Sequence, residues 1–369
     1  LQHSHSHFAF IGWVGHTIMV FIIHFLQKKL LVFNASKYNK LIVVNLICSY
    51  GMLISFIIQG YGLFSILFST SSILVAYTFG YYFFKDAKQL DQKMLAINWF
   101  KAAVLFNVIS SLGTFYLAYM MVTKNIYQEE YLASIYYYLH FQYNGWFFFG
   151  CMGLLFDFLN LTTAENPFYK NYFKIFFVSC IPAYFLSTLW LNIPLWVYII
   201  TVIAAFAQVY AWFRLLTILS KKKLETLQNF PFLLRYILWF VGFALSVKLL
   251  LQLGSTIPAL SQLAFGFRPI VIAYLHLVLL AIISLFLLFY IYANHFFYVG
   301  KSIKIGIFLF SLGVLLNEIV LAVQGIASFS YTVIPFVNQM LFGIAIIILI
   351  GILITTLYSV KKVKIPPLL

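Results

Sequence analysis

Histidine is the residue type in this sequence whose placement could carry chemistry. The chain of 369 residues has eight histidines, which fall in or beside long apolar runs, and four of them, His5, His7, His140 and His276, are the candidate ligands considered below. Neutral imidazole binds transition-metal ions through either ring nitrogen. A histidine inside a membrane is costly to leave without a partner, so each of the four is a candidate for a functional site.

The Cys, Asp and Glu residues limit the kinds of metal site that the chain could form. Cys48, Cys151 and Cys180 are widely spaced and form no C-x-x-C pair, so neither a thiolate zinc site nor a disulfide framework is supported. Asp and Glu together number only 8 in the chain, which is too few for a carboxylate-rich metal site. Haem, whose iron accepts imidazole ligands, is therefore the cofactor that fits best.

The first histidine cluster has an informative spacing. At about 100° per residue, His5 and His7 are separated by about 200° and face opposite sides of a helix, so they could serve two partners. Gly12 lies two turns below His5 on nearly the same face, where it would let a flat macrocycle approach the backbone. The alternative interpretation is an interfacial histidine cluster or a metal-scavenging tract.

Membrane-spanning helices must position these histidines. The chain is 64% hydrophobic and 8% charged, with a mean hydropathy of +0.99, whereas a soluble globule needs a polar surface. A spanning helix needs about 20 apolar residues. Runs of that length fall at about 5–26, 41–60, 62–84, 98–122, 131–159, 172–190, 194–219, 232–253, 269–293, 303–327 and 334–358.

We therefore predict an all-α, polytopic integral membrane helical bundle that forms a single domain over residues 1–369. It has about eleven transmembrane helices, or about twelve if a further helix precedes Leu1. The surroundings of such a protein are membrane lipid, and the expected location is the inner (cytoplasmic) membrane of a bacterium.

The net charge is +15, and the Lys and Arg residues that produce it lie mainly on one side of the membrane in this topology. With the loop after the first span in the cytoplasm, all Lys and Arg residues except Lys124, Lys248 and Arg268 fall in or at the edge of cytoplasmic segments. This is the positive-inside pattern of membrane proteins. It predicts that the N-terminus faces out and the C-terminus faces in, and it explains the basic charge without a nucleic-acid partner.

The direction of each span then gives each histidine a depth. The first span places His5 and His7 at or near the outer boundary. His140 lies about nine residues, or roughly 14 Å, below the outer end of the fifth span, and His276 lies about eight residues, or roughly 12 Å, down the ninth. All four histidines are thus expected in the outer half of the bilayer.

Three runs of sequence surround these histidines: His5-Ser-His7-Phe-Ala-Phe-Ile-Gly12, Tyr138-Leu-His140-Phe-Gln-Tyr-Asn144-Gly145-Trp146 and Arg268-Pro-Ile-Val-Ile-Ala-Tyr274-Leu-His276. The first resembles the H-x-H signature of the haem-copper oxidase superfamily and is most similar to the large subunit of bacterial nitric oxide reductase, in which the two histidines serve two neighbouring haems. The second resembles that family's H-x-x-x-E-G helix, whose histidine is a copper or non-haem iron ligand, with Asn144 where a Glu is expected. The third run resembles that family more weakly, in that it also places a histidine within an apolar helix.

The sequence also departs from that family. No two histidines are adjacent, so the consecutive pair that completes the family's copper site is missing, and the H-x-H run lies in the first span rather than in a late one. The resemblance therefore implies a divergent relative, similar to the NnrS-like membrane haem proteins linked to nitric oxide stress. Such a relative would keep haem b, whereas its copper or non-haem iron site would be incomplete.

In this interpretation His5, His7, His140 and His276 are the axial or metal ligands. Arg268 either pairs with a haem propionate or is an interfacial arginine whose head group snorkels to water. The activity that the resemblance implies is that of an oxidoreductase in respiratory or nitric oxide- and oxygen-linked chemistry, with an electron donor as partner.

Two further polar residues in the spans have alternative roles. Asn144 lies one turn from His140 on the same helix face, so it could orient the imidazole or bond a ligand. Glu318 in the tenth span either pairs with Lys248 of the eighth or belongs, with Asn144, to a proton route.

A second class of function also fits the composition, namely a polytopic membrane transporter or a lipid-substrate transferase without haem. Pro182 and Pro335 interrupt spans, as in transporters, but the sequence shows no pair of related halves. The Glu129-Glu130 pair in an outer loop is the only trace of a transferase site.

Overall fold

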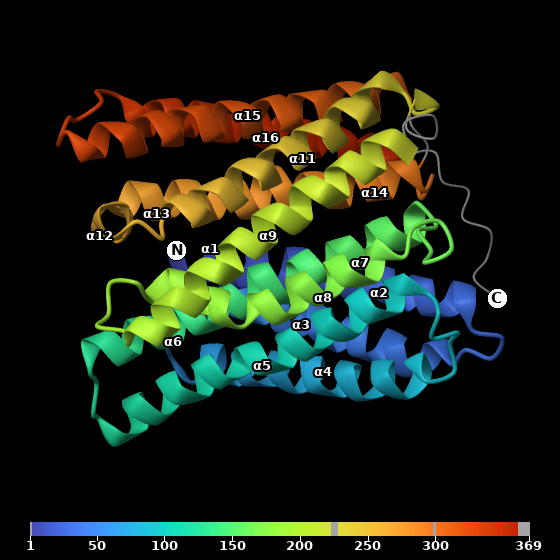
Figure 1. Cartoon of the computed structure of the whole chain (residues 1–369), viewed down its shortest axis with the longest axis horizontal. Helices are drawn as coiled ribbons and strands as arrows, with labels where there is room; N and C mark the ends of the chain where they lie inside the picture. Colours follow the sequence, from blue (N-terminus) through green and yellow to red (C-terminus); the bar gives the residue numbers. More distant parts are fainter. Residues whose placement is uncertain (1, 223–227, 298–299, 361–369) are drawn as a thin grey trace. The chain divides into compact units, whose positions relative to one another are not determined.

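The computed structural model describes residues 2–222, 228–297 and 300–360 of the chain. Helix makes up 84% of it, and the described residues contain no strand. Nine helices of this part of the chain are long and apolar enough to cross a membrane. The predicted all-α, polytopic fold is therefore confirmed (Figure 1).

Contacts divide the chain into two compact units, Leu1–Leu191 and Asn192–Leu369, called unit 1 and unit 2 below. Unit 1 contains α1 (Gln2–His7), η1 (Phe8–Gly15), α2 (His16–Lys29), α3 (Ala35–Gln59), α4 (Leu63–Ala87), α5 (Leu95–Thr123), α6 (Gln128–His140), η2 (Phe141–Phe147), α7 (Phe148–Phe158), α8 (Phe168–Cys180) and η3 (Pro182–Thr188). The segments α1, η1 and α2 form one continuous helix, as do α6, η2 and α7.

Unit 2 contains α9 (Leu195–Lys222), α11 (Phe232–Gly254), α12 (Pro258–Gly266), α13 (Arg268–His276), η4 (Leu277–Ser284), α14 (Leu285–Ala293), α15 (Lys301–Phe329) and α16 (Val337–Val360). Here α13, η4 and α14 run on as one continuous helix. Whether the two units act as the predicted single domain stays a prediction.

Every predicted span coincides with one of these helical segments. Two of the predicted spans, 131–159 and 172–190, are not among the nine helices that meet the length and composition required. The first carries Gln, Asn, His and many Tyr residues in its middle, which lower its hydropathy. The second is divided, because α8 has only 13 residues and the chain continues as the 3-10 helix η3 from Pro182. The short helix α12 fills a stretch expected to be a loop, and it begins with Pro258, which is favoured in a first turn.

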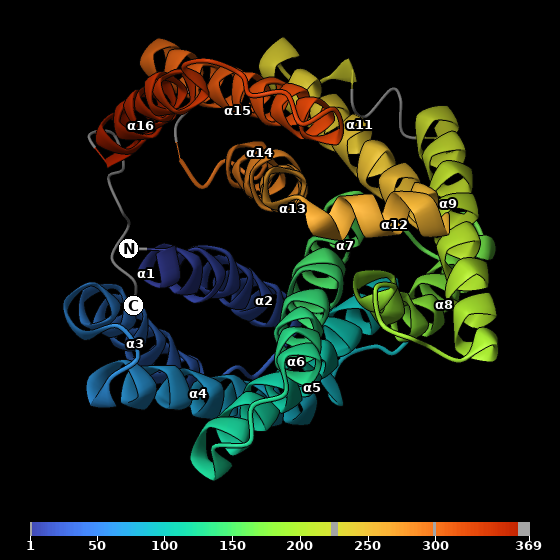
Figure 2. The ribbon, with the colours of Figure 1, turned by 90° about the vertical axis from the view of Figure 1, so that its left-hand side faces the viewer.

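Unit 1 packs around α5, which contacts α4, α6, η2, α7 and α8; Figure 2 shows α4 and α6 beside it. Trp99, Phe100 and Phe106 of α5 are completely buried. The ring of Trp99 lies 5.2 Å from that of Phe149 on α7, and Gly153 of α7 allows this approach, because a Cβ there would lie 2.5 Å from Phe100 Cε1. The core of unit 1 is therefore an aromatic seam between α5 and α7.

In the described part of unit 2 the helices with the most extensive contact are α15 and α16. Glycines allow the two backbones to approach: a Cβ on Gly351 would lie 2.5 Å from the backbone nitrogen of Phe310, and one on Gly306 would lie 2.5 Å from Thr355 Oγ1. Small residues at the contact are the usual means of packing helices in lipid, where apolar side chains gain little by leaving their surroundings.

Large apolar side chains cover much of the outside of both units. On α3 the exposed ones include Ile47, Ile54 and Ile58, the last of them 78% exposed. A water-soluble protein rarely exposes so continuous an apolar surface. These side chains are therefore in a position to contact membrane lipid.

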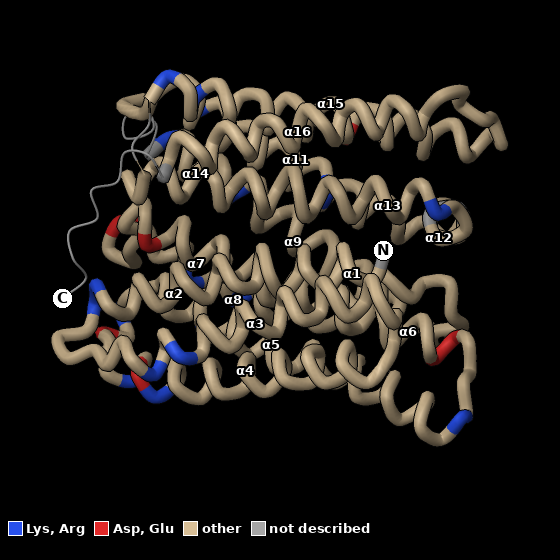
Figure 3. Tube along the Cα trace, turned by 180° about the vertical axis from the view of Figure 1, so that it is seen from behind, with Lys and Arg blue, Asp and Glu red and all other residues tan. Residues whose placement is uncertain are grey.

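Charged residues of unit 1 gather at one end of the unit, where one connection joins α2 to α3 and another joins α4 to α5 (Figure 3). Two ion pairs join helices there: Lys29 with Asp157, at 3.2 Å, and Lys37 with Asp86, at 2.8 Å. The first links α2 to α7 and the second links α3 to α4, so this end of unit 1 is held together by charge as well as by apolar packing.

Candidate functional site

Three π-helical segments of the protein begin directly after a histidine. The segment η1 follows His7, η2 follows His140 and η4 follows His276. A π-helical segment is an unusual interruption of an α-helix and is frequent at functional sites. Three of the four predicted ligands therefore occupy the same local position in three different helices.

The sequences of these segments share a spacing. The fifth residue after each histidine is small, and the next is large and apolar: Gly12 and Trp13, Gly145 and Trp146, Ala281 and Ile282. The backbone N–H that closes each segment donates to the carbonyl five residues earlier, in the pairs His16 with Ile11, Phe148 with Tyr143, and Leu285 with Leu280. These are the same three runs of sequence that surround His7, His140 and His276. The recurrence of a histidine five residues before Gly or Ala is the signal that joins them.

The glycines of two segments allow neighbouring helices to come close. A Cβ on Gly145 would lie 2.5 Å from Phe106 Cβ of α5, and one on Gly12 would lie 3.1 Å from Ser49 Cβ of α3. The face of Gly12 was expected to admit a flat macrocycle. In the structure it is packed against α3 instead.

The first histidine cluster packs on the C-terminal end of α3. The half-buried ring of His7 is stacked on Phe56 at a centroid distance of 4.5 Å and an interplanar angle of 9°. His3 meets Tyr61 edge-on at 4.9 Å, with the Tyr61 hydroxyl 3.4 Å from His3 Nδ1. Tyr61 lies between α3 and α4, and burial, with a smaller contribution from Tyr131, raises its pKa. The phenol therefore stays protonated and can donate to the imidazole. His5 is exposed, so His5 and His7 face different surroundings, as their spacing predicts.

His140 is completely buried, and both of its ring nitrogens take part in hydrogen bonds. Its Nε2 lies 2.8 Å from the carbonyl oxygen of Cys180, and its Nδ1 lies 3.1 Å from Asn144 Nδ2. A carbonyl oxygen can only accept, so Nε2 carries the hydrogen and Nδ1 accepts from the amide. The predicted contact of Asn144 with His140 is thus present, and the partner that sequence reasoning missed is the backbone of Cys180.

The position of Cys180 at the end of α8 explains this contact. The N–H of Tyr184 donates to Ile181 O at 3.2 Å, one residue later than an α-helix requires, because the chain turns into a 3-10 helix at Pro182. The carbonyl of Cys180 is thereby released from the α-helical ladder and accepts from His140. A proline in the middle of a predicted span was the only sequence signal of this exchange.

His276 in unit 2 has a different arrangement. Its Nδ1 lies 2.9 Å from the carbonyl oxygen of Ile272, one turn earlier in α13, so Nδ1 carries the hydrogen and Nε2 is the lone-pair nitrogen. This arrangement is typical of histidines that bind metals, because the backbone fixes both tautomer and orientation. Arg268, the first residue of the same helix, is exposed, in line with its predicted place at the helix mouth.

The predicted haem can be tested against these arrangements. An axial ligand needs a ring nitrogen whose lone pair can face the iron. In His276 the carbonyl of Ile272 fixes the tautomer and puts the lone pair on Nε2, and in His7 stacking on Phe56 covers the face of the ring and leaves its nitrogens at the edge. His140 does not fit in the arrangement seen, because Asn144 and Cys180 take both nitrogens.

The other predicted residues lie as follows. His5, His7, His140 and Asn144 belong to unit 1, whereas His276, Arg268 and Glu318 belong to unit 2. Glu318, on α15, accepts a long hydrogen bond of 3.4 Å from Asn317; its pairing with Lys248 and its part in a proton route stay predictions. Within the described ranges, no three His, Cys, Asp or Glu side chains are grouped to hold a metal ion.

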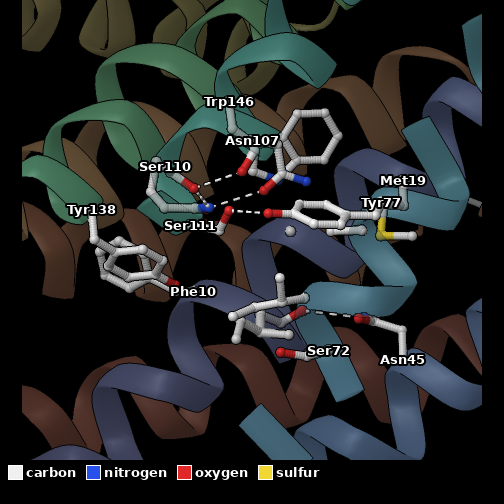
Figure 4. A pocket seen from close by; sticks show the side chains of 15 residues that line it. Phe10, Met19, Asn45, Ser72, Tyr77, Asn107, Ser110, Ser111, Tyr138 and Trp146 are labelled. Atoms are coloured by element: carbon white, nitrogen blue, oxygen red, sulfur yellow. Dashed lines mark hydrogen bonds between the residues drawn. The ribbon is translucent and has the colours of Figure 1, made fainter. Parts of the chain in front are cut away.

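The sequence alone shows no sign of a cavity in unit 1 that is lined by side chains of η1 and α2, of α3, α4 and α5, and of α6 and η2. It has a volume of about 50 Å³, and Figure 4 shows the side chains that surround it. Gln142 is one of them, a residue to which the sequence alone gave no role.

Comparison with known proteins gave no relative: no family model and no curated protein matches this chain.

Proposed function

We propose that this protein is an integral membrane protein that binds haem b and takes part in respiratory or nitric oxide- and oxygen-linked redox chemistry. The observation that carries the proposal is the shared position of His7, His140 and His276, each directly before a π-helical segment with a small residue five positions on. The motifs that resemble the haem-copper oxidase superfamily are the same runs of sequence.

Within this proposal His276 is the best-placed ligand, because the carbonyl of Ile272 holds its Nδ1–H and directs the lone pair to Nε2. His7 is the candidate ligand of unit 1, and His5 beside it faces a second partner. Arg268 is placed to neutralise a propionate, since it lies two turns before His276 on the same helix. His140 acts as a structural residue that joins α6 to α8.

Haem would supply reversible one-electron chemistry, and an electron donor is the implied partner. The carbonyl of Ile272 holds the His276 imidazole in one tautomer. A copper or non-haem iron site is not part of the proposal, because the described residues provide no group of three ligating side chains. We place the protein in the inner membrane of a bacterium with its N-terminus outside. The support is the charge pattern of the sequence and the Lys residues that gather at one end of unit 1.

An absorbance spectrum of the purified full-length protein tests the proposal. We expect a Soret band that shifts on reduction and a pyridine haemochrome typical of haem b. The His276→Ala variant should lose most of the haem per protein, and so should His7→Ala. His24→Ala is the matched control, because His24 is exposed on α2 and should retain the wild-type haem content.

A wild-type preparation that is folded and contains no haem, also after haem is added, would overturn the proposal. That result would favour the alternative class, a transporter or lipid-substrate transferase. Equal haem loss in His24→Ala and His276→Ala would show that the spectrum reports on protein quality and not on ligation.

A further inference from the structure

The cavity of unit 1 lies between the first two π-helical segments. Its lining includes Phe10 and Ile11 of η1, Gln142 and Trp146 of η2, and side chains from α3, α4 and α5. These elements belong to the spans predicted at 5–26, 41–60, 62–84, 98–122 and 131–159. The cavity is therefore within the lipid-spanning part of the unit, and Figure 4 shows the side chains that line it.

Three side-chain amides line this cavity, and each uses only one of its ends in a bond to protein. Gln142 Nε2 donates to Asn107 Oδ1 at 2.9 Å and to Ser110 Oγ at 2.8 Å. Asn45 Nδ2 lies 3.1 Å from His16 Nδ1 and 3.4 Å from Ile11 O. Gln142, Asn107 and Asn45 are only 6%, 9% and 3% exposed.

The other ends of the three amides have no partner among the described residues. Gln142 Oε1 and Asn45 Oδ1 are acceptors without a donor, and Asn107 Nδ2 is a donor without an acceptor. Polar groups buried in a protein are nearly always hydrogen-bonded, and lipid offers no partner at this depth. One donor and two acceptors, all on residues that line the same cavity, are thus left for a bound molecule.

The size of that space decides what can bind. A water molecule needs about 10–15 Å³ of such volume and two to four polar partners, so a cavity of about 50 Å³ holds about three to five. We propose that this cavity is a binding site for a cluster of water molecules that bridges the Gln142–Asn107 pair to the Asn45–His16 pair. The cluster connects η2 and α5 to η1 and α3.

Two neighbouring hydroxyls extend the site. Tyr77 lies 2.6 Å from Ser111 Oγ, and the Ser111 hydroxyl donates to Val108 O, so the phenol is the donor of the pair. The oxygen of Tyr77 then has lone pairs to accept from water. The cluster is thereby anchored on α4 as well.

Hydroxyl-radical footprinting with mass spectrometry tests this proposal, because radicals formed from bound water oxidise the side chains next to it. The probe is a short radiolytic pulse on the full-length protein in lipid nanodiscs. Met19 and Trp146 line the cavity, whereas Met152 and Trp99 do not. Met19 and Met152 are both 4% exposed, and Trp146 and Trp99 are 2% and 0% exposed, so each pair is matched in burial.

We expect Met19 to be oxidised several-fold faster than Met152, and Trp146 several-fold faster than Trp99. Equal rates within both pairs would overturn the proposal and would indicate a dry cavity or one filled by an apolar chain. This comparison uses the wild-type protein and does not depend on haem.

A variant then tests the role of the amide. Gln142→Leu should lower the rate of Met19 oxidation towards that of Met152, whereas Gln27→Leu, at an exposed position on α2, should leave it unchanged. An unchanged rate in folded Gln142→Leu would overturn the assignment of Gln142 to the cluster. If Gln142→Leu does not fold, the wild-type comparison still decides whether water is bound.

Discussion

The imidazole of His140 donates from Nε2 to the backbone carbonyl of Cys180 at 2.8 Å, across from α6 to the end of α8. Asn144 holds the other ring nitrogen, so the ring is neutral and fixed in one tautomer. A hydrogen bond to a backbone carbonyl in the lipid-spanning part of a protein has no water to replace it. This relationship makes His140 a structural link between two helices.

Removing the His140 ring should destabilise the protein. His140→Ala leaves the Cys180 carbonyl and Asn144 Nδ2 buried without these bonds, which should lower the free energy of unfolding by about 3 kcal/mol. Thermal unfolding of the purified variants measures this change. Cys180→Ala should cost less than about 1.5 kcal/mol, because the bond to His140 uses the backbone. A larger loss in Cys180→Ala than in His140→Ala would show that the thiol, not the carbonyl, is the important partner.

The buried carboxylate at the charged end of unit 1 should also matter for stability. Asp86 is 6% exposed and accepts from Lys37 Nζ and Tyr38 Oη, each at 2.8 Å. Asp86→Asn should destabilise the protein by about 2 kcal/mol, since hydrogen bonds to a charged group are stronger than neutral ones. Exposed Asp91 is the control, and Asp91→Asn should change the stability by less than about 0.5 kcal/mol. Equal effects in denaturant titrations would contradict the prediction.

Two glycines of α16 provide a matched pair for the packing of unit 2. A Cβ on Gly351 would lie 2.5 Å from the backbone nitrogen of Phe310, whereas one on Gly343 meets no atom within 4 Å. Gly351→Ala should therefore destabilise the protein by about 1–3 kcal/mol. Gly343→Ala should be neutral or slightly stabilising, because Ala is the better helix former. The apparent melting temperatures of the two variants measure the difference, and a shared value would show that α15 and α16 can separate at no cost.

The role proposed for Arg268 predicts a redox effect. A positive charge beside a propionate disfavours the ferric state, so Arg268→Gln should lower the midpoint potential of the haem. A spectroelectrochemical titration measures this potential. Lys304→Gln removes an exposed charge from α15 and is the control. A potential that is unchanged in Arg268→Gln would indicate that the arginine lies in the interface without contacting the propionate.

The sequence by itself determined the class of fold. Long apolar runs separated by short polar segments can only be helices in lipid, because the backbone must satisfy its own hydrogen bonds there. The span at 232–253, for example, corresponds to α11 within one residue at each end, whereas the span at 41–60 corresponds to α3, which begins six residues earlier. The sequence also placed Asn144 on the same helix face as His140, because the two residues are one helical turn apart.

The roles of the histidines were decided only by tertiary structure. Sequence presented His140 and His276 as equal candidates, but the carbonyl that meets His140 comes from a helix 40 residues later, and no local pattern encodes that contact. In the π-helical segments an N–H bonds to the carbonyl five residues earlier instead of four. The spacing of residues in the sequence does not reveal this change. The cavity requires side chains from five continuous helices to meet, so the part played by Gln142, which points away from His140, became visible only once those helices were packed together.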